Sequence, residues 1–99
     1  MTTVYVTAPP ESAGKISRTL VEERLAACVN KVACESVFRW DGDVVEADEV
    51  ALLVKTTAER YDELEARILE IHPHDVPCIE QFEPADVSGE FSEWISDAL

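Results

Sequence analysis

Two long segments with strand composition, residues 28–40 and 44–57, are separated by Asp41-Gly42-Asp43. Asp-Gly supplies the positive φ angles of a two-residue β-turn, so the segments predict a long antiparallel hairpin. In an unbroken strand, alternate residues of the first segment share one face: Cys28, Asn30, Val32, Cys34, Ser36, Phe38 and Trp40. A strand of this length often contains a bulge, which would shift that register. The hairpin restricts the chain to folds built on an antiparallel sheet.

Helix and strand patterns flank the hairpin on both sides. We expect strands over residues 2–7 and 78–82, helices over 12–24 and 58–71, and a short helix over 90–98. This order predicts an α+β fold of the ferredoxin-like type, a β-α-β-β-α-β antiparallel sheet with two helices on one face and a short C-terminal helix. The sequence shows no linker and no repeat, so residues 1–99 are predicted to form a single domain.

The ends of the helices are less clearly marked than the hairpin turn. Pro9-Pro10 ends the first strand, and Ser12 is expected to cap the helix that follows. No Gly or Pro separates the end of this helix from the next strand. In the short C-terminal helix, Phe91, Trp94 and Ile95 are expected to form the buried edge.

The segment from Val50 to Val54 is apolar at every position. A sheet covered by helices on one face only should alternate apolar and polar residues. The second face therefore needs a cover as well, and a chain with two long helices has none left to supply it. We expect another subunit to cover that face.

Acidic residues greatly outnumber basic ones, 21 against 8, which gives a formal net charge of −13. Nucleic-acid binding depends on neutralising phosphates, so this surface is expected to repel nucleic acid. The acids lie within segments of clear apolar periodicity, which argues against a disordered acidic chain. We interpret the excess as adaptation of a halophile to high intracellular salt, where self-repulsion is screened.

The three cysteines form no Cys-x-x-Cys pair and fit neither a disulfide framework nor a zinc ribbon. We interpret them as reduced, buried thiols. No apolar segment approaches the ~20 residues that a membrane helix requires, and the N-terminus lacks the pattern of a signal peptide. We therefore expect a soluble cytoplasmic protein that does not enter a membrane.

Four residues have chemistry that a site would use, and each has a structural alternative. Cys28 is a candidate nucleophile or soft metal ligand, or a buried thiol in a strand. His72 and His74 flank a proline at a helix C-terminus, where a histidine also interacts favourably with the helix dipole. Lys55 follows an apolar segment, so it is either placed to hold an anion or extended to the surface.

Other site patterns are absent or weak. The chain has no Gly-rich phosphate loop, no His-Glu-x-x-His, no nucleophile elbow and no calcium loop. Glu46, Asp48 and Glu49 form an acidic cluster without the spacing of a dedicated cation loop, so we interpret it as a solvated edge.

Four segments together resemble the CutA divalent-cation tolerance family, and the resemblance covers almost the whole chain. They are Glu22–Asn30, Ser36–Gly42, Glu49–Thr56 and His72–Ile79. Three residues depart from the usual family pattern: Phe38 and His74 each replace a Tyr, and Cys78 replaces a Glu.

The resemblance implies a homotrimer of ferredoxin-like subunits, built like the PII signal-transduction proteins. It also implies that the clefts between subunits collect the signature residues, here Cys28, Trp40, Glu49, Lys55 and His72. The family is associated with tolerance to divalent metals, copper above all, and with metal binding.

Our main hypothesis is a non-enzymatic trimer that binds copper or another divalent metal ion, with no obligatory cofactor. Thiolate and imidazole ligands favour copper or zinc over magnesium and calcium, so His72, His74 and Cys78 are a candidate copper site, with Cys28 as a further candidate ligand. The counter-interpretation is that Cys78 is a small apolar residue at an interface.

Two alternatives remain open. The first is a PII-like sensor in which Trp40, Glu49 and Lys55 line a cleft that binds a small molecule or anion and regulates a protein partner. The second is an enzyme using Cys28 with His72, although the sequence offers no third group to orient the base.

Overall fold

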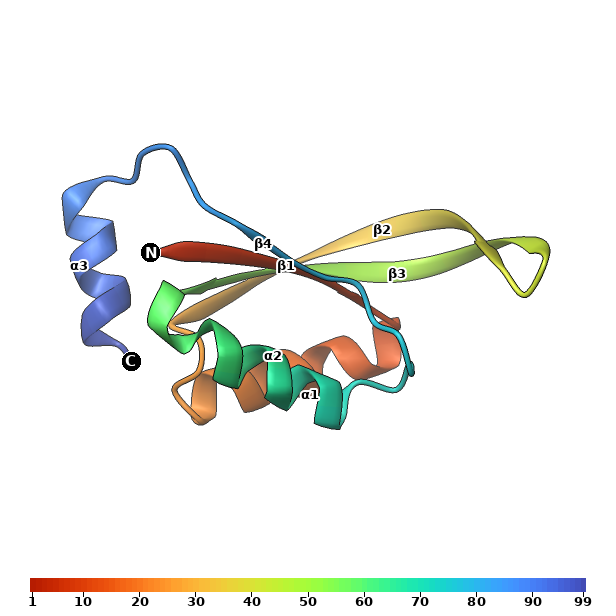
Figure 1. The fold of residues 1–99 in the computed structure, drawn as a ribbon, viewed down its shortest axis with the longest axis horizontal. Helices are drawn as coiled ribbons and strands as arrows, with labels where there is room; N and C mark the ends of the chain where they lie inside the picture. The colour runs from red at the N-terminus through yellow and green to blue at the C-terminus, as the bar shows by residue number, and fades with distance from the viewer.

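A four-stranded antiparallel sheet in the order β2-β3-β1-β4 forms the centre of the fold (Figure 1). This computed structural model describes all residues from Met1 to Leu99. The elements are β1 (Thr2–Ala8), α1 (Pro10–Glu22), β2 (Cys28–Trp40), β3 (Asp43–Thr56), the 3₁₀ turn η1 (Ala58–Arg60), α2 (Tyr61–Ile71), β4 (Ile79–Phe82) and α3 (Gly89–Asp97). The predicted α+β, ferredoxin-like arrangement is confirmed.

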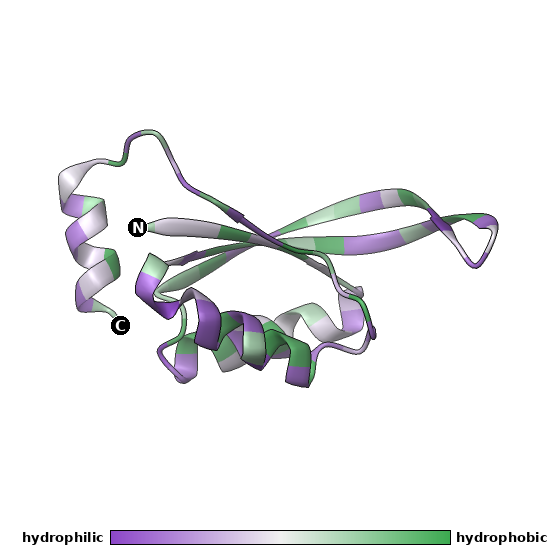
Figure 2. Ribbon diagram, viewed as in Figure 1, coloured by the Kyte–Doolittle hydropathy of each residue, from purple (hydrophilic) through white to green (hydrophobic).

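The predicted hairpin is confirmed, with its turn at the predicted residues, and β3 begins and ends one residue earlier than predicted. Trp40 pairs with Asp43, and the two residues between them, Asp41 and Gly42, have φ angles of 54° and 87°. The β2–β3 ladder runs one-to-one from Cys28 opposite Lys55 to this turn, so β2 contains no bulge. The hairpin projects well past the two long helices, and hydrophobic segments continue along it there (Figures 1 and 2).

One face of the sheet packs on α1 and α2 and forms the core. Alternate residues of β1 and β3 point toward these helices, and the most deeply buried of them are Val4, Val6, Leu52 and Val54. They meet the apolar stripes of the helices, in which Ile16, Leu20, Leu64 and Ile68 are buried. Burying each such side chain stabilises the fold by roughly 1.5–3 kcal/mol, so this contact between helices and sheet dominates the stability.

Helix α1 begins two residues earlier than predicted. Pro10 occupies its first turn, where the missing N–H of proline costs no hydrogen bond. Ser12 makes no capping bond. Its backbone N–H instead donates to the carbonyl of Pro9 over 3.0 Å, and its side chain lies within the helix.

The end of α1 explains how the chain leaves the helix without a glycine. Arg24 adopts a left-handed conformation, with a φ of 59°. The N–H of Leu25 donates to the carbonyl of Leu20 over 2.9 Å, and the N–H of Arg24 donates to that of Val21 over 3.1 Å. This pair of bonds is a Schellman motif, and Leu20 and Leu25 supply its buried apolar contact.

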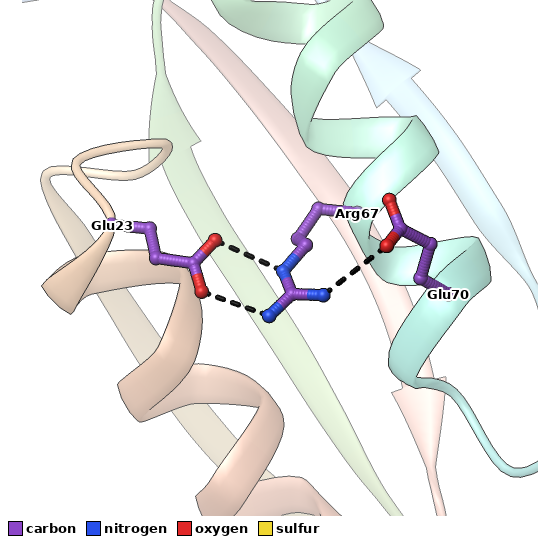
Figure 3. A network of polar contacts seen from close by, with 3 residues as sticks. All are labelled: Glu23, Arg67 and Glu70. Carbon is purple, nitrogen blue, oxygen red and sulfur yellow. Dashed lines mark hydrogen bonds and ion pairs between the residues drawn. The ribbon is translucent and has the colours of Figure 1, made fainter.

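An ion-pair network joins α1 to α2 (Figure 3). The Arg67 guanidinium donates to both carboxylate oxygens of Glu23, each over 2.9 Å, and to Glu70 over 3.3 Å. The two carboxylates raise the pKa of Arg67, chiefly through the hydrogen bonds to Glu23. A bidentate pair has a fixed geometry, so this network links the C-terminal end of α1 to α2 in a defined orientation.

The predicted buried edge of the C-terminal helix is only partly correct. Ile95 is fully buried, but Phe91 and Trp94 are 38% and 48% exposed and stack on each other with ring centroids 5.9 Å apart. Helix α3 lies beyond the end of the sheet rather than across its face, so it has only a narrow surface to cover (Figure 1). No helix of the chain is long and apolar enough to cross a membrane.

Candidate functional site

The face of the sheet opposite α1 and α2, here called the open face, is covered by no element over most of its length. The register places every second residue of β2 on it, from Cys28 to Trp40, as predicted for an unbroken strand. Val32 and Phe38 on this face are 50% and 39% exposed, and Trp40 is 60% exposed. The apolar character of Val50 to Val54 therefore serves two faces, one packed on the helices and one uncovered.

The open face carries a hollow of about 720 Å³. Its floor comes from β1, β2 and β3, and the loop from Pro73 to Val76 forms one wall. The lining residues are Tyr5, Thr7, Ser36, Phe38, Trp40, Val45, Glu49, Pro73, His74, Asp75, Val76 and Cys78. Four of the residues singled out from the sequence, Trp40, Glu49, His74 and Cys78, therefore border one space.

Cys28 and Lys55 lie elsewhere on the open face. They sit opposite each other on the β2–β3 ladder, six residues along β3 from Glu49. At the rise of a strand, six residues span roughly 20 Å, so one chain does not bring them to the hollow. The Lys55 ammonium donates to the Asn30 side chain over 3.0 Å.

His72 is buried beside the end of β1. Its Nε2 lies 2.8 Å from the carbonyl oxygen of Thr7, and its Nδ1 accepts the backbone N–H of His74 over 3.0 Å. The residue is only 7% exposed, and its ring has a partner at both nitrogens. Coordination of a metal by His72 would require one of these bonds to break. His72 bonds to Thr7, which pairs with Ala51, whereas Cys28 pairs with Lys55, four residues further along β3. Four residues of a strand span roughly 13 Å, so His72 and Cys28 do not form a catalytic pair within one chain.

His74 and Cys78 do not complete a metal centre within one chain. His74 is exposed, with its ring centroid 5.1 Å from that of His72. The Cys78 thiol lies 3.5 Å from a carboxylate oxygen of Glu80. No group of three His, Cys, Asp or Glu side chains is close enough to hold a metal ion.

Two side chains of the hollow, Tyr5 and Cys78, hold their protons more tightly than usual. Burial, and then the hydrogen bond to Glu80, raises the pKa of the Cys78 thiol. Burial also raises the pKa of Tyr5, and the nearby thiols of Cys34 and Cys78 add to this shift. A thiol must lose its proton to become a strong metal ligand, so a cation binding at Cys78 has to displace a proton held more tightly than usual.

Several lining residues were not singled out from the sequence. Tyr5, Asp75 and Val76 are the clearest cases. The alternation of Val4, Tyr5 and Val6 puts Tyr5 on the open face, so its position could be read from the pattern. The contributions of Asp75 and Val76 could not, because an irregular loop has no repeating pattern that places its side chains.

By its fold and its open face, the chain is a ferredoxin-like α+β subunit that carries candidate ligand side chains on an uncovered face of the sheet. The family follows from sequence, since residues 2–98 match the model of the CutA1 divalent ion tolerance protein family. The chain belongs to this family, whose description names no catalytic activity.

Individual relatives agree with this assignment. A divalent-cation tolerance protein CutA from Thermus thermophilus is 43% identical over 96 residues, which are 95% of this chain and 93% of the relative. A solved CutA from Archaeoglobus fulgidus, described as periplasmic, has a TM-score of 0.94 at 36% identity and covers 99% and 98% of the two chains. A protein described as PII-like CutA from Nostoc has a TM-score of 0.95 at 31% identity, covering 99% and 96%.

Proposed function

We propose that this protein is a non-enzymatic, homotrimeric metal-binding protein that contributes to tolerance of divalent cations, copper above all. Membership of the CutA1 family supports the connection to divalent cations. The observation that carries the proposal is the hollow, because Glu49, His74 and Cys78 offer carboxylate, imidazole and thiol groups along its border. A complete ligand set needs either a movement of the 73–76 loop or a donor from another chain.

The trimer is supported by what the chain leaves uncovered. The open face exposes large apolar side chains, and both outer strands have a free edge. These edges differ greatly, since β2 has 13 residues and β4 has 4. A head-to-tail contact, in which the β2 edge of one chain meets the β4 edge of the next, closes into a ring when the rotation per subunit permits. Sedimentation or native mass spectrometry in molar salt tests this, and a monomer alone would contradict it.

A preference for copper follows from the chemistry of the donors. Thiolate and imidazole are ligands for copper and zinc, whereas magnesium and calcium prefer oxygen. His74 and Cys78 stand where the family usually has Tyr and Glu, so this chain offers softer ligands at its hollow. We propose these two residues, with Glu49, as the primary ligands contributed by each chain.

The test compares two cysteine variants. Cys78→Ser should weaken copper binding by well over tenfold, more than ~1.4 kcal/mol, while leaving the oligomer intact. Cys28→Ser is the matched control, because Cys28 is also half-buried on the open face but lies outside the hollow. Equal copper affinity in Cys78→Ser and the parent protein would refute the role of Cys78. A loss in Cys28→Ser alone would move the site to the Cys28–Lys55 pair, and a loss in both variants would indicate a site shared between two chains.

A second candidate function is supported by Lys55. Its ammonium is held on the open face by a single bond to Asn30, and a cationic group in such a position suits a small anion. A PII-like sensor would bind that anion between subunits near Trp40, Glu49 and Lys55 and pass the state to a partner. Calorimetry with nucleotides and simple phosphates, on the parent and Lys55→Met, tests it, and an absence of heat for every anion would exclude it.

We also propose that the protein works in the cytoplasm of a halophile. The support is the formal net charge of −13, which is costly in dilute buffer and screened in concentrated salt. Fractionation of the source cells, followed by immunodetection, tests the location, and recovery outside the cytoplasm would contradict it.

A further inference from the structure

One buried side chain, that of His72, bonds to the loop of residues 73–76 that forms a wall of the hollow. His72 is the residue at which α2 ends, and its own N–H donates to the carbonyl of Ile68 over 2.8 Å. The loop then passes the C-terminal end of β1 on its way to β4 (Figure 1). At this point the His72 ring bonds to β1 on one side and to the loop on the other.

The hydrogen bonds determine the form of the ring. The N–H of His74 can only donate, so Nδ1 of His72 must be the acceptor and carries no proton. A neutral ring then has its proton on Nε2, which donates to the carbonyl of Thr7. The two distances, 3.0 and 2.8 Å, are those of ordinary hydrogen bonds, and both bonds are partly buried. The neutral Nε2–H tautomer is therefore the one that satisfies every partner.

We propose that His72 is a positioning residue, which fixes the 73–76 loop against β1 and so places His74 on the border of the hollow, rather than a metal ligand itself. Three restraints act together on this loop: the bond from His72 to Thr7, the bond from His74 to His72, and the fixed φ of Pro73 between the two histidines. The part of this inference that concerns cations rests on the proposed function; the part that concerns the loop does not.

The chain offers variants that separate the two bonds. An amide at position 72 can replace one ring nitrogen at a time: the shorter His72→Asn can still accept the His74 N–H, and the longer His72→Gln can still donate to Thr7. His72→Ala removes both bonds. His74→Ala is the matched control, because it removes the His74 ring but keeps the backbone N–H that bonds to His72.

The first experiment measures the loop directly. Nitrogen NMR of the parent protein should show the Nε2–H tautomer at His72, and the amide of His74 should exchange slowly with solvent. Exchange of that amide should become fast in His72→Ala and His72→Gln, and stay slow in His72→Asn and for residue 74 in His74→Ala. An Nδ1–H tautomer, or rapid exchange of the His74 amide in the parent, would overturn the inference.

The second experiment measures copper affinity at a temperature where each variant is fully folded by circular dichroism. His72→Ala should bind copper about tenfold more weakly, as outer-shell partners of ligands typically require. Its copper(II) paramagnetic resonance spectrum should keep the same number of coordinated imidazoles as the parent. Loss of one imidazole signal would make His72 a ligand, and unchanged affinity would make it a purely structural residue; either result refutes the proposal. If the parent binds no copper, the proposed function fails, and the His74 amide alone decides the role of His72 in the loop.

Discussion

Helix α1 ends in a left-handed residue that carries a full side chain. Arg24 occupies the position after the helix cap where glycine is usual, with a φ of 59°. Its side chain is exposed, and its guanidinium makes no hydrogen bond or ion pair within the chain. The residue therefore contributes backbone strain without a compensating contact, and Arg24→Gly should stabilise the protein.

The magnitude follows from two opposing effects. A left-handed conformation costs a residue with a Cβ roughly 1–2 kcal/mol, and glycine removes this cost. Glycine also makes the unfolded chain more flexible, which lowers the free energy of unfolding by about 0.4–1 kcal/mol. The net gain is about 0.5–1 kcal/mol, which corresponds to a rise of roughly 4 °C in Tm for a domain of this size.

The assay is thermal and urea unfolding of Arg24→Gly, Arg24→Ala and the parent at one protein concentration, since an oligomer's stability depends on it. Arg24→Ala is the control, because it removes the same charge but keeps the Cβ that clashes with the backbone. Glycine should be more stable than alanine. If the two variants have the same Tm and urea midpoint, or if the glycine variant is the less stable, the strain assigned to Arg24 does not exist.

Three further predictions concern charge and protonation. Tm should rise from dilute buffer to molar KCl, because salt screens the excess of acidic groups; a Tm that does not change across this range would contradict the halophile hypothesis. Arg67→Ala should lower Tm more than Arg18→Ala, because Arg67 bonds two carboxylates and joins two helices, whereas Arg18 bonds only Glu22 on its own helix. Molar salt should reduce the difference in Tm between these two variants; equal losses of Tm would mean that the network of Figure 3 adds nothing to stability. In a protein whose only thiol is Cys78, alkylation by iodoacetamide should reach half its maximal rate at higher pH in the folded state than in urea. Because this folded-state pKa is raised, the associated stability is fully present below the unfolded pKa and is lost as pH rises through the folded one.

The parts of the fold that the sequence predicted well are those governed by local chemistry. The Asp41-Gly42 turn was identified to the residue, because few other dipeptides accept two positive φ angles. The face shared by Cys28 through Trp40 followed from alternation alone, and the bulge considered there is absent. The uncovered face was also anticipated from Val50 to Val54, since apolar residues on both sides of a strand require two covers.

Other features could not be predicted, because they depend on which of several local preferences prevails or on how the elements pack in three dimensions. Ser12 has capping chemistry, but Pro10 suits the first turn of the helix and moved the start two residues earlier. The helix predicted over residues 58–71 is divided, because Ala58–Arg60 forms a 3₁₀ turn before α2. Phe91 and Trp94 have the spacing of a buried edge, yet the position of α3 beyond the sheet leaves them exposed.

The sequence also predicted the candidate ligand residues better than it predicted their surroundings. Residue type grouped His72, His74 and Cys78, but it could not show that both nitrogens of His72 bond within the chain. It also could not show that Cys28 and Lys55 lie roughly 20 Å along the open face from Glu49. One chain therefore presents two separate groups, roughly 20 Å apart, on a single uncovered surface.

These two groups can form one binding site only if a contact between subunits brings them together. A contact related by a twofold axis would bring identical patches together, whereas a head-to-tail contact brings one end of a chain to the other end of its neighbour. The proposed trimer uses the second arrangement, because a ring of three subunits is built from head-to-tail contacts. In such a ring, Cys28 and Lys55 of one subunit can complete a site begun by Glu49, His74 and Cys78 of the next.

Mixing Cys28→Ser chains with Cys78→Ser chains distinguishes a site shared between two chains from a site that each chain forms alone. If the ligands are shared across the interface, some contacts in the mixed ring regain both thiols and copper binding partly recovers. If each chain supplies its ligands alone, binding in the mixture equals the average of the two variants, and the shared site is refuted.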